Sequence, residues 1–540
     1  MQDDPNKVTY FAETDSRHDR KKFGIKSEDR SKHVYVIGKT GMGKSTLLEN
    51  MAIQDIQNGN GLAFVDPHGS TAEKLLEYIP QERIKDVIYF APFDMDYPVA
   101  FNIMEDVGAE KRHLVVNGLM SVFEKIWEDA WSARMAYILQ NTLLALLEYP
   151  GATLLAVNRM YTDKEFRNKV VENVSDISVK SFWVDEYAKF TDRYAQEATP
   201  AIQNKVGQFA GNPLIRNIIG QPKSSFDLRK IMDEKKILIV NLSKGRVGDG
   251  NARLLGSMLI TKIYLAAMSR ADESAVSLSK LPQFYLFVDE FQSFADKSFA
   301  EILSEARKYK LNLIMAHQYI EQMEEEVRDA VFGNVGTMVT FRVGAYDAEV
   351  LEKEFAPVFT AEDLVNLGLR QIYLKLMIDS VTSQPFSATT LSPIEKPPVS
   401  YVQEILSNSR RTYARPRSVV EQSIIDWHGP ASSTSLDRAR DKSLGASKKP
   451  EPKIVDTRGF TPTKPVLPPR KVEPKISLEQ LKIKTDNQRK PDQKNVSALR
   501  EALSRITSYP NPSQPSPSQG RGNKPGPSPE ELKKVLGVHE

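Results

Sequence analysis

The segment GKTGMGKS at residues 38–45, here called the phosphate loop, constrains the fold of this chain more than any other part of it. It matches the pattern G-x-x-x-x-G-K-[ST] in full, follows the apolar run HVYVIG and opens the helical pattern STLLENMAIQDI. Small residues let backbone N–H groups curl around a phosphate, and the helix N-terminus adds a favourable dipole. The order strand, loop, helix therefore predicts a phosphate site near the start of an α/β domain.

The polar residues at the end of the phosphate loop have separate expected roles. Lys44 is predicted to reach the β- and γ-phosphates of a nucleoside triphosphate, Ser45 to bind Mg²⁺ through its hydroxyl, and Thr46 to contact the α-phosphate. The alternative is a glycine-rich turn that binds no ligand. The strand before the loop and the helix after it favour the phosphate site.

Apolar runs of strand length recur between residues 33 and 377 and predict a sheet. They lie at 33–38, 61–66, 87–92, 236–242, 284–290, 311–318, 337–343 and 371–377. Most are continuous rather than alternating, as expected for strands buried on both faces of a parallel sheet. Helical patterns separate several of them, so we predict an α/β domain with helices on both faces.

One interval, 105–230, shows helical periodicity and almost no strand signal, so we predict an all-α domain inserted into the α/β domain. We divide the chain accordingly: an N-terminal polar segment at 1–21, the α/β domain with the phosphate loop at 22–104 and 231–395, the inserted helical domain at 105–230, a helical extension at 396–430 and a tail at 431–540.

The tail differs in composition from the rest of the chain. It holds 22 Lys and Arg against 12 Asp and Glu, together with 15 of the 32 prolines, and its only aromatic residues are Phe460 and Tyr509. So few large apolar groups cannot offset the entropy of ordering, and we predict a disordered basic tail. It is either a solvated tail with transient helix or a basic tether with docking helices for nucleic acid or a partner.

Composition excludes several classes of function. The chain has no cysteine, which excludes disulfides, Cys-ligated zinc, iron–sulfur clusters and thiol catalysis. The polar N-terminus has no apolar core of signal-peptide length, and no apolar stretch reaches the length of a membrane span. We expect no intrinsic membrane span and a cytoplasmic location.

The run FYLFVDE places two acids at the end of a predicted strand. Asp289 is expected to hold Mg²⁺ through a bound water, and Glu290 to polarise the attacking water. The alternative is a solvated strand end. An adjacent glutamate predicts hydrolysis rather than phosphorylation of a small molecule.

Further polar residues follow other strands. The run LNLIMA ends in His317 and Gln318, and a polar side chain there is expected to contact the γ-phosphate or its water, unless this is an ordinary strand-to-loop transition. Arg342 and Arg307 are competing candidates for an arginine that a neighbouring subunit supplies to the transition state, the alternative for each being a surface ion pair.

The sequence DPHG at 66–69 follows the strand GLAFV, so it should lie beside the phosphate loop at the carboxyl edge of the sheet. Asp66 is either an aid to metal or water, or part of an ordinary turn. His68 has no paired ligand nearby in the sequence, which argues against zinc.

Taken together, these motifs resemble the HerA–FtsK superfamily of hexameric translocase ATPases, and more closely the type IV secretion coupling ATPases of the TraG/TraD type used in conjugative DNA transfer. The resemblance covers roughly 22–395. Besides the phosphate loop and its flanks, it rests on the blocks YPVAFNIME, NKVGQFAGNPLIRNIIGQ, ILIVNLSKGRVG, YLFVDEFQSFA, AHQYIEQM and FRVGAYDAEVLEKEF.

The resemblance implies a RecA-like motor domain with an inserted all-α domain, ATP bound between the subunits of a ring, and DNA or a DNA–protein complex threaded through the pore. It implies Asp289 and Glu290 as the second motif and Gln318 as the sensor. The residues that it implies for ATP and Mg²⁺ are Gly38, Lys39, Thr40, Gly41, Met42, Gly43, Lys44, Ser45 and Thr46. The sequence departs from the family at Ser70, where an acidic residue is common.

Two classes of function stay open from the sequence. The first is an ATP-driven motor that translocates DNA, with a hexameric ring and a relaxase-type or secretion-system partner that recruits it to the inner face of the membrane. The second is a non-translocating ATPase that docks protein substrates onto a secretion apparatus. A HerA-like DNA-processing motor shares the chemistry of the first, but we find no nuclease motif.

Overall fold

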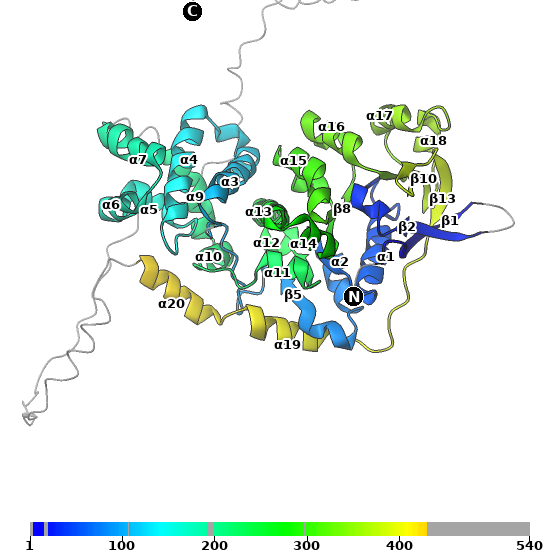
Figure 1. Ribbon diagram of the computed structural model, residues 1–540, viewed down its shortest axis with the longest axis horizontal. Coiled ribbons are helices and arrows are strands. Elements are labelled where there is room, and N and C mark those ends of the chain that lie inside the picture. Colours follow the sequence, from blue (N-terminus) through cyan, green and yellow to red (C-terminus); the bar gives the residue numbers. More distant parts are fainter. Residues whose placement is uncertain (1–3, 16–19, 106, 192–198, 296, 429–540) are drawn as a thin grey trace, which may run out of the picture. The chain divides into compact units, whose positions relative to one another are not determined.

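The computed structural model describes residues 4–15, 20–105, 107–191, 199–295 and 297–428 (Figure 1). Among these residues, one 11-stranded sheet has the order β2-β1-β13-β10-β9-β3-β8-β7-β4-β6-β5. Its strands are β1 (Val8–Thr14), β2 (Lys22–Lys26), β3 (Val34–Ile37), β4 (Gly61–Asp66), β5 (Val87–Phe90), β6 (Ile237–Asn241), β7 (Phe284–Val288), β8 (Leu311–His317), β9 (Thr337–Thr340), β10 (Gln371–Lys375) and β13 (Phe386–Thr390). A separate antiparallel pair joins β11 (Met377–Ile378) to β12 (Val381–Thr382).

The strands from β9 to β5 pair in parallel. Every residue of β3, β4, β6, β7, β8 and β9 is buried, which is why these strands are unbroken apolar runs in the sequence. Their side chains alternate between two hydrophobic cores, since Val34 and Val36 belong to one core and Tyr35 and Ile37 to the other.

Helices contribute to the core on each side of the sheet. Leu47 of α1 (Lys44–Gln57) and Ala72 of α2 (Ser70–Leu76) lie in one core. Helices α13 (Asp249–Met268) and α15 (Ser298–Glu305) lie in the other. The expected α/β class with helices on both faces is confirmed. The remaining helices around the sheet are α12 (Lys244–Val247), α14 (Ala275–Lys280), α16 (Glu325–Asn334), α17 (Ala345–Phe355) and α18 (Ala361–Val365).

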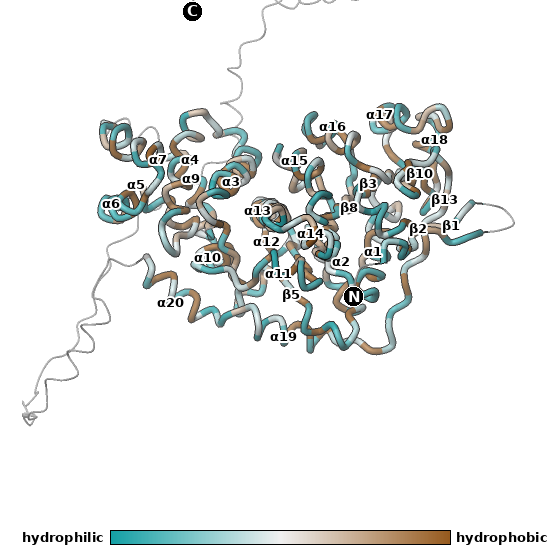
Figure 2. Tube along the Cα trace, viewed as in Figure 1, coloured by the Kyte–Doolittle hydropathy of each residue, from teal (hydrophilic) through white to brown (hydrophobic). Residues whose placement is uncertain are grey.

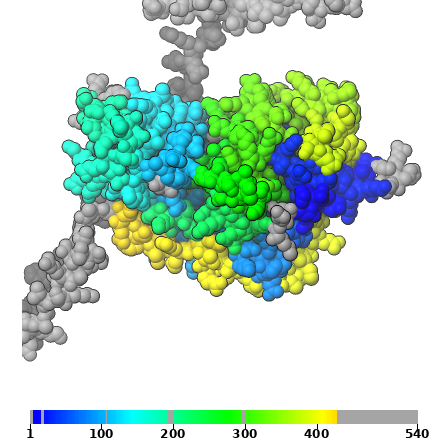
Figure 3. All heavy atoms as spheres, in the orientation of Figure 1, coloured from blue at the N-terminus to red at the C-terminus, as the bar shows by residue number. Residues whose placement is uncertain are grey.

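The sheet extends beyond the boundary that we expected at residue 22. Strand β1 comes from the segment that the sequence analysis set apart as polar, and it pairs antiparallel with β13 and β2. Figure 3 shows these N-terminal strands, in blue, against the yellow segment that contains β13. The strand is half-buried, with Thr9 and Phe11 buried and Tyr10 exposed, and this short alternation is hard to recognise between charged neighbours.

Among the described residues between β5 and β6, all of the regular secondary structure is helical. The α-helices are α3 (Arg112–Ile126), α4 (Ala133–Glu148), α5 (Ala156–Thr162), α6 (Lys164–Asn173), α7 (Ile177–Ser181), α9 (Pro200–Gly211), α10 (Pro213–Ile219) and α11 (Leu228–Asp233). Hydrophilic and hydrophobic residues alternate along them (Figure 2), as in amphipathic helices that share a core. An all-α insertion therefore interrupts the sheet, as the fold class predicted.

Two further helices follow the sheet domain. Helix α19 (Val402–Tyr413) packs against β5, where Ser409 Oγ accepts a hydrogen bond of 2.9 Å from the backbone N–H of Tyr89. Helix α20 (Arg417–His428) packs against α10 of the insertion, where Asn217 donates to Glu421. The predicted disordered tail at 431–540 lies outside the described residues. Among the helices that are described, none is long and apolar enough to cross a membrane.

A buried histidine joins the start of β3 to its neighbours. His33 is fully buried, its Nδ1 accepts a hydrogen bond of 3.1 Å from the backbone N–H of Leu313, and its Nε2 lies 3.1 Å from the carbonyl oxygen of Leu303. An Nδ1 that accepts from N–H carries no proton, so this arrangement holds the neutral imidazole. Burial lowers the pKa of His33 to about 4. The bond to Leu303 opposes this shift, and the charge of Arg307 adds to it.

We expect acid to destabilise the protein through His33. Between pH 7 and pH 5 the unfolded chain, with a histidine pKa of about 6.5, binds a proton that the folded chain does not. The free energy of unfolding should therefore fall by about 2 kcal/mol between pH 7 and pH 5 because of His33. It should fall little further below pH 4. Urea unfolding midpoints at pH 7 and pH 5 would measure it, and His33→Gln should reduce the pH-dependent loss. An equal loss in the variant and the wild type would contradict this prediction.

Candidate active site

The carboxyl ends of β3, β8, β7 and β4 meet at one edge of the sheet, because these neighbouring strands are parallel. A cavity of about 250 Å³ opens there. Residues from all four strand ends and from the start of α1 line it: Thr40, Gly41, Gly43, Lys44, Ser45, Thr46, His68, Asp289, Glu290, Ala316, His317 and Gln318. Residues predicted from separate motifs are thus brought together in one place.

The backbone of the phosphate loop can be built only with glycine at its two ends. A Cβ on Gly38 would lie 2.5 Å from the Cβ of Phe341, and Gly43, directly before α1, has a φ of 121°. Backbone hydrogen bonds fix the loop to the sheet, since the N–H of Lys39 donates to the carbonyl of Arg342 at 2.8 Å and the N–H of Gly38 to that of His317 at 3.3 Å.

The side chain of Lys44 turns into its own loop. Its Nζ donates to the carbonyl oxygens of Gly38 at 2.6 Å and Lys39 at 3.1 Å. Burial lowers the pKa of Lys44, while the nearby carboxylates of Asp289 and Glu290 oppose this shift. A partly desolvated ammonium at the N-terminus of α1 is suited to bind phosphate oxygens.

Ser45 and Asp289 come together although they are far apart in the sequence. The hydroxyl of Ser45 donates to Oδ2 of Asp289 at 3.0 Å. Burial, followed by the charge of Asp66, raises the pKa of Asp289, and the bond from Ser45 opposes this. Among the described residues no group of three or more His, Cys, Asp or Glu could hold a metal ion by itself. A hydroxyl and one carboxylate instead fit Mg²⁺, which usually takes few protein oxygens together with phosphate oxygens.

Both carboxylate oxygens of Glu290 are engaged by neighbouring side chains. Its Oε1 lies 2.6 Å from Nε2 of His68, and its Oε2 accepts from Nζ of Lys244 at 3.0 Å. Burial raises the pKa of the Glu290 carboxyl, but the bonds from His68 and Lys244 outweigh burial, so the pKa lies below its ordinary value. The backbone of Glu290 is left-handed, with a φ of 46°.

The two polar residues at the end of β8 point in different directions, because successive side chains of a strand alternate. Gln318 faces the phosphate loop and donates to Thr40 Oγ1 at 2.7 Å. His317 is fully buried, its Nδ1 lies 2.9 Å from the hydroxyl of Tyr35, and its Nε2 has no hydrogen-bond partner. Burial, followed by the charges of Lys44 and Lys125, lowers the pKa of His317 to about 3.

The two candidate arginines lie at opposite ends of the strands. Arg342 follows β9, and its carbonyl is bonded to the phosphate loop of its own chain. Arg307 is exposed in the turn before β8 and so lies near the other edge of the sheet. Neither placement tests a role in a neighbouring subunit, which stays a prediction for both.

The structure shows the turn role considered for Asp66, while an aid to metal or water stays a prediction. Its carboxylate oxygens accept from the backbone N–H groups of His68 at 2.8 Å and Ala72 at 2.9 Å, which is the turn role. Sequence reasoning did not find Lys244. The only signal for it was its position just after the apolar run at 236–242, at the same edge of the sheet.

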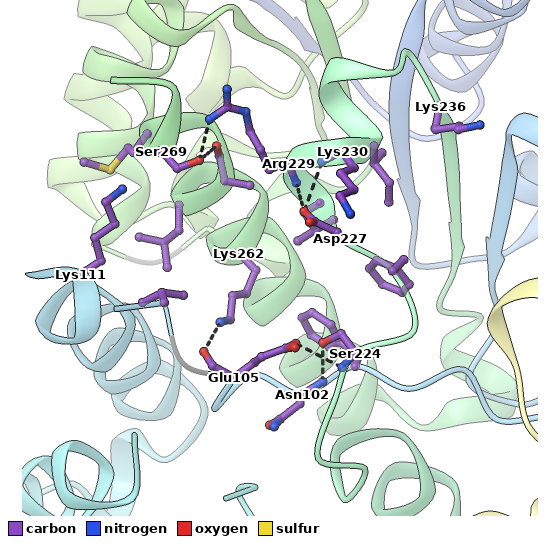
Figure 4. A pocket seen from close by; sticks show the side chains of 18 of the residues that line it. Asn102, Glu105, Lys111, Ser224, Asp227, Arg229, Lys230, Lys236, Lys262 and Ser269 are labelled. Carbon is purple, nitrogen blue, oxygen red and sulfur yellow. Dashed lines mark hydrogen bonds between the residues drawn. The ribbon is translucent and has the colours of Figure 1, made fainter. Parts of the chain in front are cut away.

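A larger pocket, of about 790 Å³, lies elsewhere, between the start of the helical insertion and helices α11 and α13 (Figure 4). Basic side chains line it, but the structure pairs several of them with acceptors. Lys262 donates to the carbonyl of Glu105, and Lys236 to Asp86 at 3.0 Å. Because this pocket has neither a phosphate loop nor an acid pair, we place the candidate active site in the smaller cavity.

The fold and the site define a P-loop NTPase. Residues 22–355 match the family model of the type IV secretion-system coupling protein DNA-binding domain, and the chain belongs to this family. The resemblance inferred from the sequence motifs is thereby confirmed. No curated protein matches the sequence.

Solved structures have a similar fold at low sequence identity. One is the plasmid coupling protein TrwB in complex with ADP and Mg²⁺, with 16% identity, a TM-score of 0.51, and coverage of 72% of this chain and 96% of that chain. Another is TrwB in complex with the non-hydrolysable ATP analogue ADPNP, with 15% identity, a TM-score of 0.50, and coverage of 73% and 96%. At these identities the likeness is one of fold.

Proposed function

We propose that this chain is an ATP-hydrolysing ring motor that translocates DNA, or a DNA–protein complex, as a coupling protein of type IV secretion. The observation that carries the proposal is the single cavity shared by Lys44, Ser45, Asp289 and Glu290, in a chain that belongs to the coupling-protein family. These are the residue types that phosphoryl transfer to water requires: a phosphate cradle, metal ligands and a general base.

ATP and Mg²⁺ fit the residues present. Lys44 would exchange its two carbonyl acceptors for β- and γ-phosphate oxygens. The N–H groups of the phosphate loop after Lys39 would surround the phosphates, since those of Gly38 and Lys39 are bonded to the sheet. Ser45 and Asp289 hold Mg²⁺, which when bound neutralises charge on the phosphates. Gln318, already bonded to Thr40 of the phosphate loop, contacts the γ-phosphate or its water.

Glu290 acts as the general base in this scheme. It accepts a proton from the attacking water, and ADP and phosphate are the products. A ring of identical subunits, which we propose to be hexameric, would supply an arginine from the neighbouring subunit, with Arg342 and Arg307 as the two candidates.

We propose DNA as the translocated partner because the family description names a DNA-binding domain. A secretion-system or relaxase-type protein would bring the motor to the inner face of the membrane from the cytoplasm. The competing function is a docking ATPase that recruits protein substrates without moving DNA. A HerA-like processing motor would share the chemistry and differ in its partner.

Replacing the phosphate-loop lysine should abolish nucleotide-dependent activity. Lys44→Ala removes the charge-assisted hydrogen bonds to the phosphates, so ATP affinity should fall by about ten-fold or more. Equilibrium binding of a fluorescent ATP analogue measures the loss. Lys308→Ala is the matched control, because Lys308 is exposed and pairs with Glu305 away from the cavity. Unchanged affinity in Lys44→Ala would exclude this loop as the phosphate site.

Removing the general base should separate binding from hydrolysis. Glu290→Gln keeps the size of the side chain but cannot take a proton, so it should retain ATP and hydrolyse it about 100-fold or more slowly. Single-turnover hydrolysis and ATP affinity, measured on the same preparation, test both halves of the expectation. Normal turnover in the variant would exclude Glu290 as the base.

DNA should stimulate hydrolysis if the chain is a translocase. We expect the ATPase rate to rise several-fold with single- or double-stranded DNA, and the effect to weaken as salt rises, because phosphate contacts release counterions. The experiment titrates both kinds of DNA at two salt concentrations and measures the particle mass with and without nucleotide. No response to DNA, together with stimulation by a secretion component, would favour the docking ATPase.

A further inference from the structure

Neighbouring side chains bind both carboxylate oxygens of Glu290. His68 lies 2.6 Å from Oε1 and Lys244 lies 3.0 Å from Oε2. His68 comes from the loop after β4, and Lys244 from the start of α12, so elements on the same side of β7 hold the two oxygens. We call these three residues, His68, Lys244 and Glu290, the carboxylate clamp.

A clamped carboxylate is a weaker base than a free one, because each hydrogen bond that it accepts stabilises its deprotonated form. A general base must offer an oxygen within hydrogen-bond reach of the water that it deprotonates. The backbone of Glu290 adds to the constraint, since its φ of 46° and ψ of 49° are unfavourable for a residue with a Cβ and persist only where surrounding contacts hold them. Release of one arm of the clamp should therefore make Glu290 a more effective base.

Lys244 lies at the start of the short helix α12, and a displacement of this helix would release Glu290. Besides Glu290, its Nζ contacts Ser293 Oγ at 3.1 Å and Asp249 Oδ1 at 3.7 Å. Helix α12 has four residues and leads through Gly248 into α13, so a shift of α13 along its axis would move Lys244 relative to Glu290.

Helix α13 touches both the helical insertion and the segment that follows Glu290. On one side it packs against α3 so closely that a Cβ on Gly118 would collide with Thr261. On the other side a Cβ on Gly256 would collide with Phe294, and Ser257 donates to the carbonyl of Phe294 at 3.1 Å. Contacts this tight transmit displacement rather than absorb it.

The insertion also reaches this segment directly. Nζ of Lys125, near the end of α3, donates to the carbonyl of Gln292 at 3.3 Å, and Glu124 pairs with Lys297 at 3.2 Å. The residues that follow the general base are therefore held by α12, α13 and α3, of which α3 belongs to the insertion and α13 packs against it.

We propose that Lys244 is a positioning residue that, together with His68, withholds Glu290 from the attacking water until a load on the helical insertion shifts α13 and opens the clamp. This rests on the proposed function, since it assigns Glu290 as the base and DNA as the load. The clamp couples hydrolysis to the presence of DNA: without load the base is occupied, and with load it is free.

The test compares wild type with Lys244→Met in the full chain. Methionine keeps the length and the apolar stem but removes the ammonium. We expect the turnover without DNA to rise by about five-fold. The reason is that losing one partly exposed ion pair increases the population in which the clamp is open by about that factor. The KM for ATP should change less than two-fold, and the ratio of DNA-stimulated to basal turnover should fall. A basal turnover that is unchanged or lower would overturn the proposal.

Two matched variants separate the clamp from loss of charge in general. Lys244→Arg keeps a cation on the carboxylate and should keep the low basal turnover, whereas a rise equal to that of Lys244→Met would overturn the proposal. Lys308→Met removes an exposed lysine that pairs with Glu305 outside the site, and it should leave both rates unchanged. A rise in Lys308→Met equal to that in Lys244→Met would also overturn the proposal.

A variant of His68 keeps the proposal testable if Lys244→Met does not fold. The side chain of His68 is 53% exposed, so His68→Leu should fold, and it should also raise basal turnover with little change in KM. No rise in this variant would overturn the proposal. Wild-type turnover in the same experiment separates the proposed function from the clamp. If the wild type does not hydrolyse ATP, the proposed function fails. If it hydrolyses ATP but neither variant gains basal turnover, only the clamp fails.

Discussion

Parallel pairing of β3, β8, β7 and β4 is the constraint on which the site depends. The register sets Ile37 opposite His317 and Val65 opposite Val288, so the residues that follow these strands emerge at one edge. The phosphate loop and the acid pair are separated by more than two hundred residues of chain, including the whole insertion. Burial of these strands on both faces holds the register, because a slip would break both cores at once.

Charge compensation is the second principle of the site. Buried or half-buried ionisable groups need polar partners, and here each of them has such partners within the site. Lys44 turns to backbone carbonyls near Asp289, Asp289 accepts from Ser45, and Glu290 is held by two donors. The same contacts that stabilise the charges also occupy the groups that chemistry requires, so activity depends on exchanging partners rather than on building a site.

The helical insertion is in direct contact with the elements that form the candidate site. Its first helix, α3, packs on α13 and contacts the segment after Glu290, while α20 packs on α10 at the other end of the insertion. The insertion therefore has contacts with both the catalytic segment and the C-terminal helices.

The sequence by itself determined the phosphate loop, the buried parallel strands, the acid pair and the all-α insertion, because each is written in local patterns: residue spacing, apolar runs and helical periodicity. It missed β1, whose half-buried alternation is short. It also missed the contact of His68 and Lys244 with Glu290 and the hydrogen bond from Gln318 to Thr40. Only the tertiary structure decided these, because they depend on which strand ends are neighbours and which way each side chain points, and no local pattern records either.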